Sequence, residues 1–454
     1  MARAKKETAL TPEERLQAAL VPDWEWPYKL PENWCWTRIG MVSNFERGIT
    51  FPAAAKEAAP TEDNIPCLRT ANVQENLEID DMIYVNRDFM KGNIAKLVRE
   101  NDIIMSSANS RELVGKSSLV THIPFPMTFG GFVLNIRAKE MSSKYLFYFL
   151  RHEFLAGKFI GESSQTTNIA NINTTTLGNY EIPLPPLAEQ QRIVDRIESL
   201  FAKLDEAKEK AQAVVDSFET RKAAILHKAF TGELTAKWRE EHGVSIDNWK
   251  TTRFDSVAAI RSNLVDPAEY QSFPHIAPDN IEKKTGVLLE YHTIAEDGVT
   301  SGKHRFYSGQ ILYSKIRPYL SKAVVVDFDG LCSADMYPIE AYQNARCLWY
   351  YMLSDEFLLQ ASTAGSRSVL PKINQKELSA LTVHLPTNDR EQEEIARILD
   401  ELFDKEQQSK EAAEAVLDQI ELMKKSILAR AFRGELGTND PNEESAVELL
   451  KQII

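Results

Sequence analysis

Residues 189–234 begin with EQQRIVDRIESLFAKL (189–204) and end with ILHKAFTGEL (225–234). Residues 391–436 begin with EQEEIARILDELFDKE (391–406) and end with ILARAFRGEL (427–436). They align without a gap at an offset of 202 residues, with 21 identities in 46 positions. Upstream, Ile172-Asn173 matches Ile373-Asn374, and Asn33-Trp34 matches Asn248-Trp249. Such repetition predicts two tandem halves of about 200 residues, each a variable globular part followed by a well-matched tail.

Both tails are predicted to be long helices. Apolar side chains recur every 3.5 residues on average, which is the pattern of a coiled-coil seam. Gly232 and Gly434 predict the helix ends, and about 43 residues would give a helix of about 65 Å. Because each tail has one seam and a globular part separates the tails, we expect them to pair antiparallel; two separate amphipathic helices, each lying on its own globular part, are the alternative. The predicted seam consists of Ile193, Ile197, Leu200, Leu204, Val214, Phe218, Ile225, Ile395, Leu399, Leu402, Val416, Ile420 and Ile427.

The globular parts have the alternation of short apolar runs and aromatic-rich helical segments that is typical of a mixed α/β fold. The first half predicts strands at Ile79–Val85, Asp102–Met105, Val114–His122 and Phe132–Arg137 and a helix at Tyr145–Leu150, and the second half has Gln310–Tyr313, Ala323–Asp327 and Leu348–Leu353 in the same order. The predicted fold class is therefore mixed α/β, with two tandem globular domains, two long helices forming an antiparallel coiled coil, and a pseudo-two-fold repeat. The expected segments are 1–30, an N-terminal segment; 31–187, the first globular domain; 188–241, the first long helix and linker; 245–386, the second globular domain; 389–436, the second long helix; and 437–454, a C-terminal tail helix.

Composition places the chain among globular proteins. Of its 454 residues, 43% are hydrophobic and 26% are charged, which excludes global disorder. No apolar run is long enough for a transmembrane helix, and no hydrophobic segment follows the basic N-terminus as in a secretory signal. The four cysteines lack metal-ligand spacing and predict reduced thiols in a cytoplasmic protein.

The net charge of −13 argues against nucleic acid as a partner only if it is evenly spread. It is not, because residues 389–454 alone carry −8 while each globular part carries −2. The segment Lys303–Lys322 holds five cations and no acid among tyrosines, and Ser106–Arg111 offers small polar groups and an arginine. Such segments suit contacts to phosphates and base edges, although most loops of this kind are ordinary solvated turns.

The candidate DNA contacts are all loop residues. Asn72 and Asn280 sit at matching points of the two halves, and turn formation is nearly as good an explanation for both. In the first half the candidates are Arg47, Thr50, Arg69, Asn72, Ser107, Asn109, Arg111 and Lys116; in the second they are Arg261, Asn280, Lys315, Arg317, Tyr319, Lys322 and Arg367.

Motifs for catalysis are missing. Gly115-Lys116-Ser117 resembles the end of a P-loop, but the position five residues before Gly115 is Ser110 and not glycine. The eight histidines lack metal-ligand spacing, so no catalytic residue and no metal site are predicted. Two other classes stay open: a coiled-coil scaffold for protein interactions without sequence-specific DNA binding, and a methyltransferase or nuclease with cryptic motifs.

The sequence resembles a known family, the specificity (S) subunits of type I restriction–modification systems. The resemblance rests on Ile182-Pro183-Leu184-Pro185-Pro186-Leu187-Ala188-Glu189-Gln190 and on the Ala-Phe-x-Gly-Glu-Leu close of both tails. Trp26-Pro27, Leu30-Pro31-Glu32-Asn33-Trp34 and Glu444-Ser445-Ala446 are also similar to the family. The second copy departs from the pattern because Leu385-Pro386-Thr387-Asn388 lacks the double proline.

The resemblance implies that each globular part is a target recognition domain reading one half of a bipartite DNA site. The helix pair would set the spacer between the half-sites and dock two methyltransferase (modification) subunits, which restriction (nuclease/translocase) subunits would join. The chain itself would be non-catalytic and without a cofactor, with S-adenosylmethionine, ATP and Mg in the partner subunits. It also implies that the N-terminal segment and the C-terminal tail lie near each other, with Leu16 close to Leu449.

Overall fold

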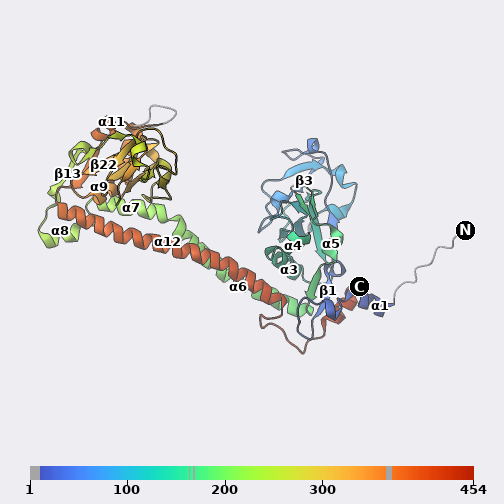
Figure 1. The fold of residues 1–454 in the computed structure, drawn as a ribbon. Coiled ribbons are helices and arrows are strands. Elements are labelled where there is room, and N and C mark those ends of the chain that lie inside the picture. The colour runs from blue at the N-terminus through green and yellow to red at the C-terminus, as the bar shows by residue number, and fades with distance from the viewer. Residues whose placement is uncertain (1–10, 163, 167–168, 365–370) are drawn as a thin grey trace. The chain divides into compact units, whose positions relative to one another are not determined.

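The computed structural model describes residues 11–162, 164–166, 169–364 and 371–454. They form two compact units (Figure 1). Unit 1 consists of the chain up to Glu209 together with Val416–Ile454, and unit 2 consists of Lys210–Ala415. Each unit therefore contains one globular part and the ends of both long helices, so the units do not follow the boundary of the sequence repeat.

Unit 1 is built on a four-stranded antiparallel sheet in the order β2-β9-β5-β7. Its buried strand residues Ile103, Met105 and Ile136 pack under helix α3, whose Tyr145 and Leu150 are also buried. The strands are β1 (Cys35–Arg38), β2 (Ser43–Arg47), β3 (Asn64–Leu68), β4 (Ile83–Asn86), β5 (Ile103–Ser106), β6 (Ala108–Asn109), β7 (Ser117–Leu119), β8 (Thr128–Phe129), β9 (Val133–Ala138), β10 (Ser164–Thr166), β11 (Ile169–Asn171) and β12 (Glu181–Leu184). The helices are α1 (Pro12–Ala19), α2 (Ile39–Val42), α3 (Ser143–Leu155), α4 (Lys158–Glu162), α5 (Thr174–Gly178), the first part of α6 (Leu187–Asp216), the end of α12 (Asp389–Phe432) and α13 (Ala446–Ile453).

Unit 2 repeats this plan with a four-stranded sheet in the order β14-β22-β19-β20 and a larger five-stranded sheet, β15-β18-β21-β16-β17. Its strands are β13 (Trp249–Arg253), β14 (Ala258–Ile260), β15 (Leu264–Val265), β16 (Pro274–Ile276), β17 (His292–Thr293), β18 (Lys303–Phe306), β19 (Ile311–Ser314), β20 (Ala323–Val325), β21 (Gly330–Cys332), β22 (Met336–Ala341) and β23 (Thr382–Pro386). Its helices are α7 (Phe218–Phe230), α8 (Ala236–His242), α9 (Ala345–Met352), α10 (Asp355–Ala364) and α11 (Gln375–Ala380), with the start of α12. The predicted mixed α/β class is confirmed for both halves.

The predicted strands and helices lie where the pattern placed them, but several are shorter. Ile79–Val85 forms a strand only as β4 from Ile83, and Val114–His122 only as β7. Before Ile83 the chain is held in a turn, because the carbonyls of Glu78 and Asp81 accept hydrogen bonds from the Asn72 side chain. Before Ser117, Gly115 adopts a positive φ of 87°, which is outside the strand region. The segment Leu348–Leu353 lies in helix α9 and at its end, at the place in the repeat where α3 lies in the first half.

The two long helices run antiparallel where they pair. In unit 1 the Lys208 ammonium lies 2.9 Å from Glu421, and the Lys424 ammonium lies 2.5 Å from Asp205. In unit 2 Arg221 of α7 lies 2.6 Å from Glu406. In unit 1, as the residue number rises on α6, the number of its partner on α12 falls, and this is the antiparallel arrangement that the sequence predicted (Figure 1).

The first tail is not one continuous helix, contrary to the prediction. Helix α6 ends at Asp216 and α7 begins at Phe218. The carbonyl of Val214, which would accept the Phe218 amide in a regular helix, instead accepts the Ser217 hydroxyl at 3.3 Å and the Arg221 guanidinium at 3.2 Å. These side chains take over the backbone hydrogen bond, and the helix breaks at Ser217.

The predicted seam residues differ in burial along the helices. Val416 is 45% exposed, so it does not belong to the packed seam, whereas the nearby Ala413 and Ile420 are 8% and 3% exposed. Ile193, Ile197, Phe218, Ile395, Leu399 and Ile420 are buried, and Leu200, Leu204, Val214, Ile225, Leu402 and Ile427 are half-buried. The helix ends share their cores with the globular parts, because Ile193 and Phe432 pack in the core of unit 1, and Ile395 and Phe230 pack in that of unit 2.

Both termini of the described chain lie in unit 1. Thr11 begins α1 with a capping box, since its hydroxyl accepts the Glu14 amide at 3.2 Å while the Glu14 carboxylate accepts the Thr11 amide at 2.8 Å. Helix α1 packs against α13, and Leu16 and Leu449 line the same core. The N-terminal segment and the C-terminal tail are therefore neighbours, as the resemblance implied.

Candidate nucleic-acid interfaces and the helix pair

One end of the four-stranded sheet of unit 1, which we call the candidate end, brings together four of the eight candidate residues of the first half. At this end β2 and β5 finish and β9 and β7 begin, because Arg47 pairs with Leu134, Ser106 with Val133, and Met105 with Ser117. Arg47, Ser107, Asn109 and Lys116 all lie in or directly beside these strand ends. Loops that leave one end of a rigid sheet form a common surface, and such loops carry binding functions in many folds.

The corresponding end of the unit 2 sheet has the same backbone hydrogen bonds. The Ser106 amide donates to the Lys116 carbonyl at 2.8 Å, and the Ser314 amide donates to the Lys322 carbonyl at 3.0 Å. The Ser107 carbonyl accepts the Ile172 amide at 2.9 Å, and the Lys315 carbonyl accepts the Ile373 amide at 2.9 Å. Ser107 and Lys315 thus occupy equivalent positions, and the two units present different side chains on one shared backbone arrangement.

Five candidates are exposed and have no side-chain hydrogen bond or ion pair with another described residue: Arg47, Thr50, Arg111, Arg317 and Tyr319. Arg317 adopts a left-handed backbone with φ 48°, and its amide donates to the Pro371 carbonyl at 2.7 Å. Since a non-glycine residue seldom adopts positive φ, the loop holds the backbone of Arg317 in a specific conformation. These residues remain predicted DNA contacts.

The other basic candidates are engaged within the protein. Arg69 lies 3.0 Å from Asp81 and Arg261 lies 2.7 Å from Glu340. The ammonium of Lys116 donates to Gln74, that of Lys315 to the Ala334 carbonyl at 2.5 Å, and that of Lys322 to the Pro278 carbonyl at 2.6 Å. Ser107 donates to the Phe132 carbonyl and Asn109 to the Ser106 hydroxyl, each at 3.0 Å. A DNA contact from any of these would have to compete with an existing partner.

Asn72 and Asn280 hold turns, which is the alternative that the sequence left open. The side-chain oxygen of Asn72 accepts the Arg69 amide at 2.8 Å, and that of Asn280 accepts the Ala277 amide at 2.8 Å. Their amide groups donate to the carbonyls of Glu78 and Glu290. Asn72 is 2% exposed and Asn280 is half-buried, so a DNA contact from either side chain would have to replace these turn hydrogen bonds. Both stay predicted contacts, with turn formation as the role that the structure shows. The last candidate, Arg367, lies outside the described residues.

Sequence reasoning missed Phe132, which is 66% exposed beside Ser107 at the candidate end of unit 1. It also missed the cross-helix contacts of two repeated pairs. The Lys424 ammonium lies 5.3 Å from the Phe201 ring centroid in unit 1, and the Lys222 ammonium lies 5.5 Å from the Phe403 ring centroid in unit 2. All four residues are identities of the 202-residue repeat, so the signal was present, but a seam rule that looks only for apolar residues passes over lysine.

Each globular part packs on the long helix that follows it, and the contacts are made by equivalent residues in the two halves. Lys144 pairs with Glu198 at 2.8 Å in unit 1, and in unit 2 the repeat-related Arg346 pairs with Asp400. The rings of Tyr148 and Phe201 lie 6.0 Å apart, and those of Tyr350 and Phe403 lie 5.4 Å apart. The sequence repeat is therefore also a repeat of contacts, which holds the globular part at a fixed place on its helix.

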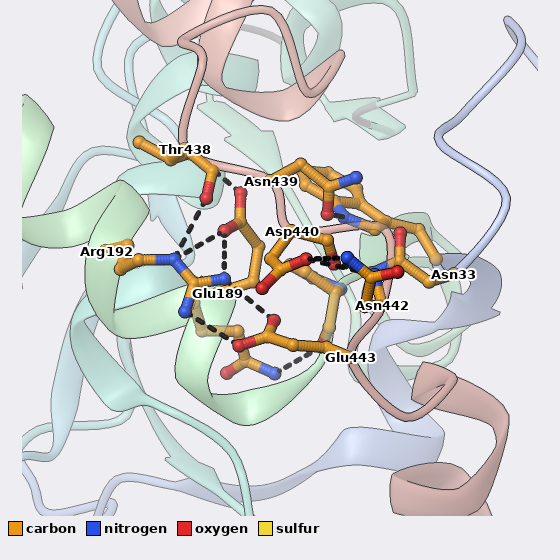
Figure 2. A network of polar contacts seen from close by, with 11 residues as sticks. Asn33, Glu189, Arg192, Thr438, Asn439, Asp440, Asn442 and Glu443 are labelled. Carbon is orange, nitrogen blue, oxygen red and sulfur yellow. Dashed lines mark hydrogen bonds and ion pairs between the residues drawn. The ribbon is translucent and has the colours of Figure 1, made fainter.

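The first turn of each long helix carries a buried glutamate with an extended set of partners. Figure 2 shows the unit 1 network, in which Glu189 accepts from Thr438 at 2.6 Å and from Arg192, while Arg192 also pairs with Glu443 at 2.7 Å. Burial raises the pKa of Glu189 above its ordinary value, against the hydrogen bonds of Thr438 and Arg192, which lower it. The segment after α12 is thereby fixed to the start of α6.

Unit 2 has the equivalent network around Glu391. Its carboxylate accepts from Thr235 at 2.8 Å, Arg239 at 2.7 Å, Asn248 at 2.9 Å and Trp249 at 3.0 Å. Burial acts to raise the pKa of Glu391, but these hydrogen bonds outweigh it, and the pKa lies below its ordinary value. The neighbouring Gln392 donates to the Pro386 carbonyl at 2.8 Å, as Gln190 does to that of Pro185 at 2.9 Å. The repeated Glu-Gln pair thus has a structural role: it links the start of each long helix to the strand before it and to the segment that follows the other helix.

Within the described ranges, no three His, Cys, Asp or Glu side chains are grouped so that they could hold a metal ion. Over the same part of the chain, no helix is both long and apolar enough to cross a membrane.

Two repeated domains that present different loops on one backbone arrangement, each anchored on an antiparallel helix pair, define a tandem recognition protein. A model of the type I restriction modification DNA specificity domain matches residues 31–215 and again residues 246–417. The chain belongs to the family of type I restriction–modification DNA specificity subunits, which confirms the resemblance seen in the sequence.

Named relatives agree with this assignment. The chain is 37% identical over 342 residues to the specificity subunit of the type I restriction enzyme EcoDI from Escherichia coli, which covers 69% of this chain and 76% of the relative. It is 26% identical over 464 residues to the EcoKI specificity subunit from E. coli strain K12, covering 94% and 96%.

Solved structures show the same fold. The HsdS subunit from Thermoanaerobacter tengcongensis superposes with a TM-score of 0.58 at 18% identity, over 90% of this chain and 99% of that one. A chain from a structure on complex assembly and conformational transition of the type I R-M system gives a TM-score of 0.67 at 19% identity, over 90% of this chain and all of the other.

Proposed function

We propose that each globular part of this chain reads one half of a bipartite DNA site with the loops at the candidate end of its four-stranded sheet. One observation carries this proposal: Ser107 and Lys315 are held by the same backbone hydrogen bonds at equivalent places but have different side chains. Two domains that recognise different short DNA sequences can share one backbone arrangement if their side chains differ. The reason is that base edges are distinguished by their patterns of hydrogen-bond donors and acceptors.

The charges support the same surface. Arg47 and Arg111 in unit 1 and Arg317 in unit 2 are exposed and have no carboxylate partner among the described residues. Cations without an internal counter-charge attract phosphates and can release counterions on binding. Residues 389–454 carry −8 of the net charge of −13 and lie away from these loops in sequence.

In this proposal the helix pair sets the spacer between the half-sites and docks two methyltransferase subunits, which restriction subunits join. S-adenosylmethionine, ATP and Mg would then be bound by those partner subunits, and this chain would contribute recognition and no catalytic group. A protein that reads genomic DNA together with such partners would act in the cytoplasm.

The decisive experiment is to map methylated adenines genome-wide in cells that carry this chain with its methyltransferase subunit. We expect one bipartite motif, two short defined half-sites separated by a spacer of fixed length, which disappears when this chain is deleted. A scaffold without DNA specificity is the competing function; it would give methylation without a motif and no sequence-selective retention of duplexes in a gel shift with the methyltransferase subunits present.

A further inference from the structure

Arg305 lies at the candidate end of unit 2 although its strand, β18, belongs to the neighbouring five-stranded sheet. Its amide donates to the carbonyl of Asn263 at 3.4 Å, and Asn263 follows the end of β14 by three residues. Arg261, in the same connection, donates its amide to the Pro338 carbonyl at 2.8 Å. Arg305 therefore stands next to the strand ends that carry the predicted contacts of the second half-site.

Aromatic rings hold the guanidinium of Arg305. Its central carbon lies 4.9 Å from the ring centroid of Tyr307, 5.4 Å from that of Tyr270 and 5.9 Å from that of Phe273. Tyr270 and Phe273 pack edge to face at 5.1 Å, so the group of rings is itself ordered. Because Tyr307 is 44% exposed, the cluster opens to the surface. Stacking of this kind fixes the plane of the guanidinium and leaves the charge in place.

The charge and donors of Arg305 are not used up inside the protein. Among the described residues no carboxylate forms an ion pair with Arg305, and its Nε is buried without a hydrogen-bond acceptor. The neighbouring cations are different, because Arg261 pairs with Glu340 at 2.7 Å, and Lys315 and Lys322 donate to main-chain carbonyls. Arg305 is thus, like Arg317, a cation without an ion-pair partner among the described residues. Because its Nε is buried, the two terminal nitrogens of the guanidinium are the donors that a ligand can reach.

We propose that Arg305 reads a base of the second half-site, and that its ligand is the edge of a guanine in the major groove. The inference rests on the proposed function of this sheet end. A planar guanidinium donates two parallel hydrogen bonds to O6 and N7 of guanine, the commonest specific contact of arginine with DNA. Since the rings already fix the plane, little side-chain freedom is lost on binding, and a base that offers only one acceptor or a donor is rejected.

The test uses the full chain assembled with its methyltransferase subunits and a duplex library randomised over both half-sites. For Arg305→Ala we expect one guanine of the second half-site to become degenerate, with a loss of preference of about 10- to 100-fold, while the first half-site is unchanged. Arg305→Lys keeps the positive charge but loses the two parallel N–H donors of the guanidinium. We therefore expect it to retain overall DNA affinity and to lose the preference for that guanine. Arg253→Ala is the matched control. It removes an arginine of the same unit that lies at the end of β13 and already pairs with Asp255 in the following turn, so we expect the motif to stay unchanged.

A second variant guards against a folding defect. Tyr307→Ala removes an exposed ring and leaves the buried residues of unit 2 in place, so we expect a smaller loss at the same guanine. Several results would overturn the inference: an unchanged motif in Arg305→Ala, an equal loss for all duplexes, which would indicate a phosphate contact, or full specificity in Arg305→Lys. A wild-type complex that selects no motif at all would instead overturn the proposed function, and this inference with it.

Discussion

Glu189 and Glu391 are the same residue of the sequence repeat, and each accepts a hydrogen bond from a threonine of the chain that follows a long helix. Thr438, after α12, donates to Glu189 at 2.6 Å, and Thr235, after α7, donates to Glu391 at 2.8 Å. In unit 1 the chain that leaves one long helix is thus tied to the start of the other, and in unit 2 the same tie is formed with the roles of the helices exchanged. The chain after each repeated helical tail therefore supplies a threonine to the glutamate at the start of the other tail.

The two glutamates should respond oppositely to acid. The folded-state pKa of Glu391 is lowered, so its stabilisation is present above the ordinary value of 4.5 and is lost as pH falls through the lower folded pKa. The pKa of Glu189 is raised, so folding disfavours its ionised form, and acidification relieves this cost instead. We expect Glu391→Gln to weaken unit 2 by about 1–3 kcal/mol at pH 7, since the buried donors around it lose their charged acceptor. We expect Glu189→Gln to cost unit 1 less.

Hydrogen exchange of the first turns of α6 and α12 at pH 7 and below pH 4.5 measures both effects. The difference between wild type and Glu391→Gln should shrink at the lower pH. Equal costs for the two variants at pH 7, with the same pH dependence, would contradict the opposite pKa shifts.

Recognition of the half-sites should be separable by single substitutions. Changing Arg111 to Ala should impair the half-site read by unit 1, and changing Arg317 to Ala the half-site read by unit 2, by about 1–3 kcal/mol if each makes a bidentate base contact. Competition binding with duplexes mutated in one half-site at a time measures this. If either variant weakens all sequences equally, that arginine contacts a phosphate.

The turn asparagines should matter for folding and not for reading. Asn72→Ala leaves the buried amide of Arg69 and the carbonyls of Glu78 and Asp81 without their partner, which should destabilise unit 1 by about 1–3 kcal/mol. The free energy of unfolding from denaturant titration reports this cost. The methylation motif should keep every position, and a motif altered in one half-site would restore Asn72 as a reading residue.

The packed face of α12 should be found at Ile420 and not at Val416. Ile420 is 3% exposed and Val416 is 45% exposed on the same helix. Ile420→Ala should therefore cost about 2–4 kcal/mol through lost burial and a cavity, whereas Val416→Ala should stay within about 0.5 kcal/mol. Thermal or denaturant unfolding of the full chain compares the two directly, and similar costs would mean that the heptad assignment at Val416 was right.

The sequence determined the large-scale plan of this protein. The 21 identities at a fixed offset of 202 residues already predicted two halves, because a repeated sequence folds into a repeated structure. The apolar periodicity predicted the long helices, and the globular part between them in the sequence predicted their antiparallel pairing. The resemblance to the family rested on Pro185-Pro186, the Glu-Gln pair and the Ala-Phe-x-Gly-Glu-Leu close. Each of these features is local or periodic, so no knowledge of tertiary contacts was needed.

Only the tertiary structure decided which polar side chains remain available to a ligand. Arg261 and Arg305 look alike in the sequence, yet one pairs with Glu340, 79 residues away, and the other lies among three rings without an ion-pair partner among the described residues. Asn72 looked like a reading group and is a buried turn residue, and Val416 followed the heptad but faces outward. The physical reason is that partners and burial depend on how the chain folds in space. The partner of Arg261 lies 79 residues away, the bonds of Asn72 need a turn that closes on Glu78 and Asp81, and Val416 is exposed because the other face of its helix packs.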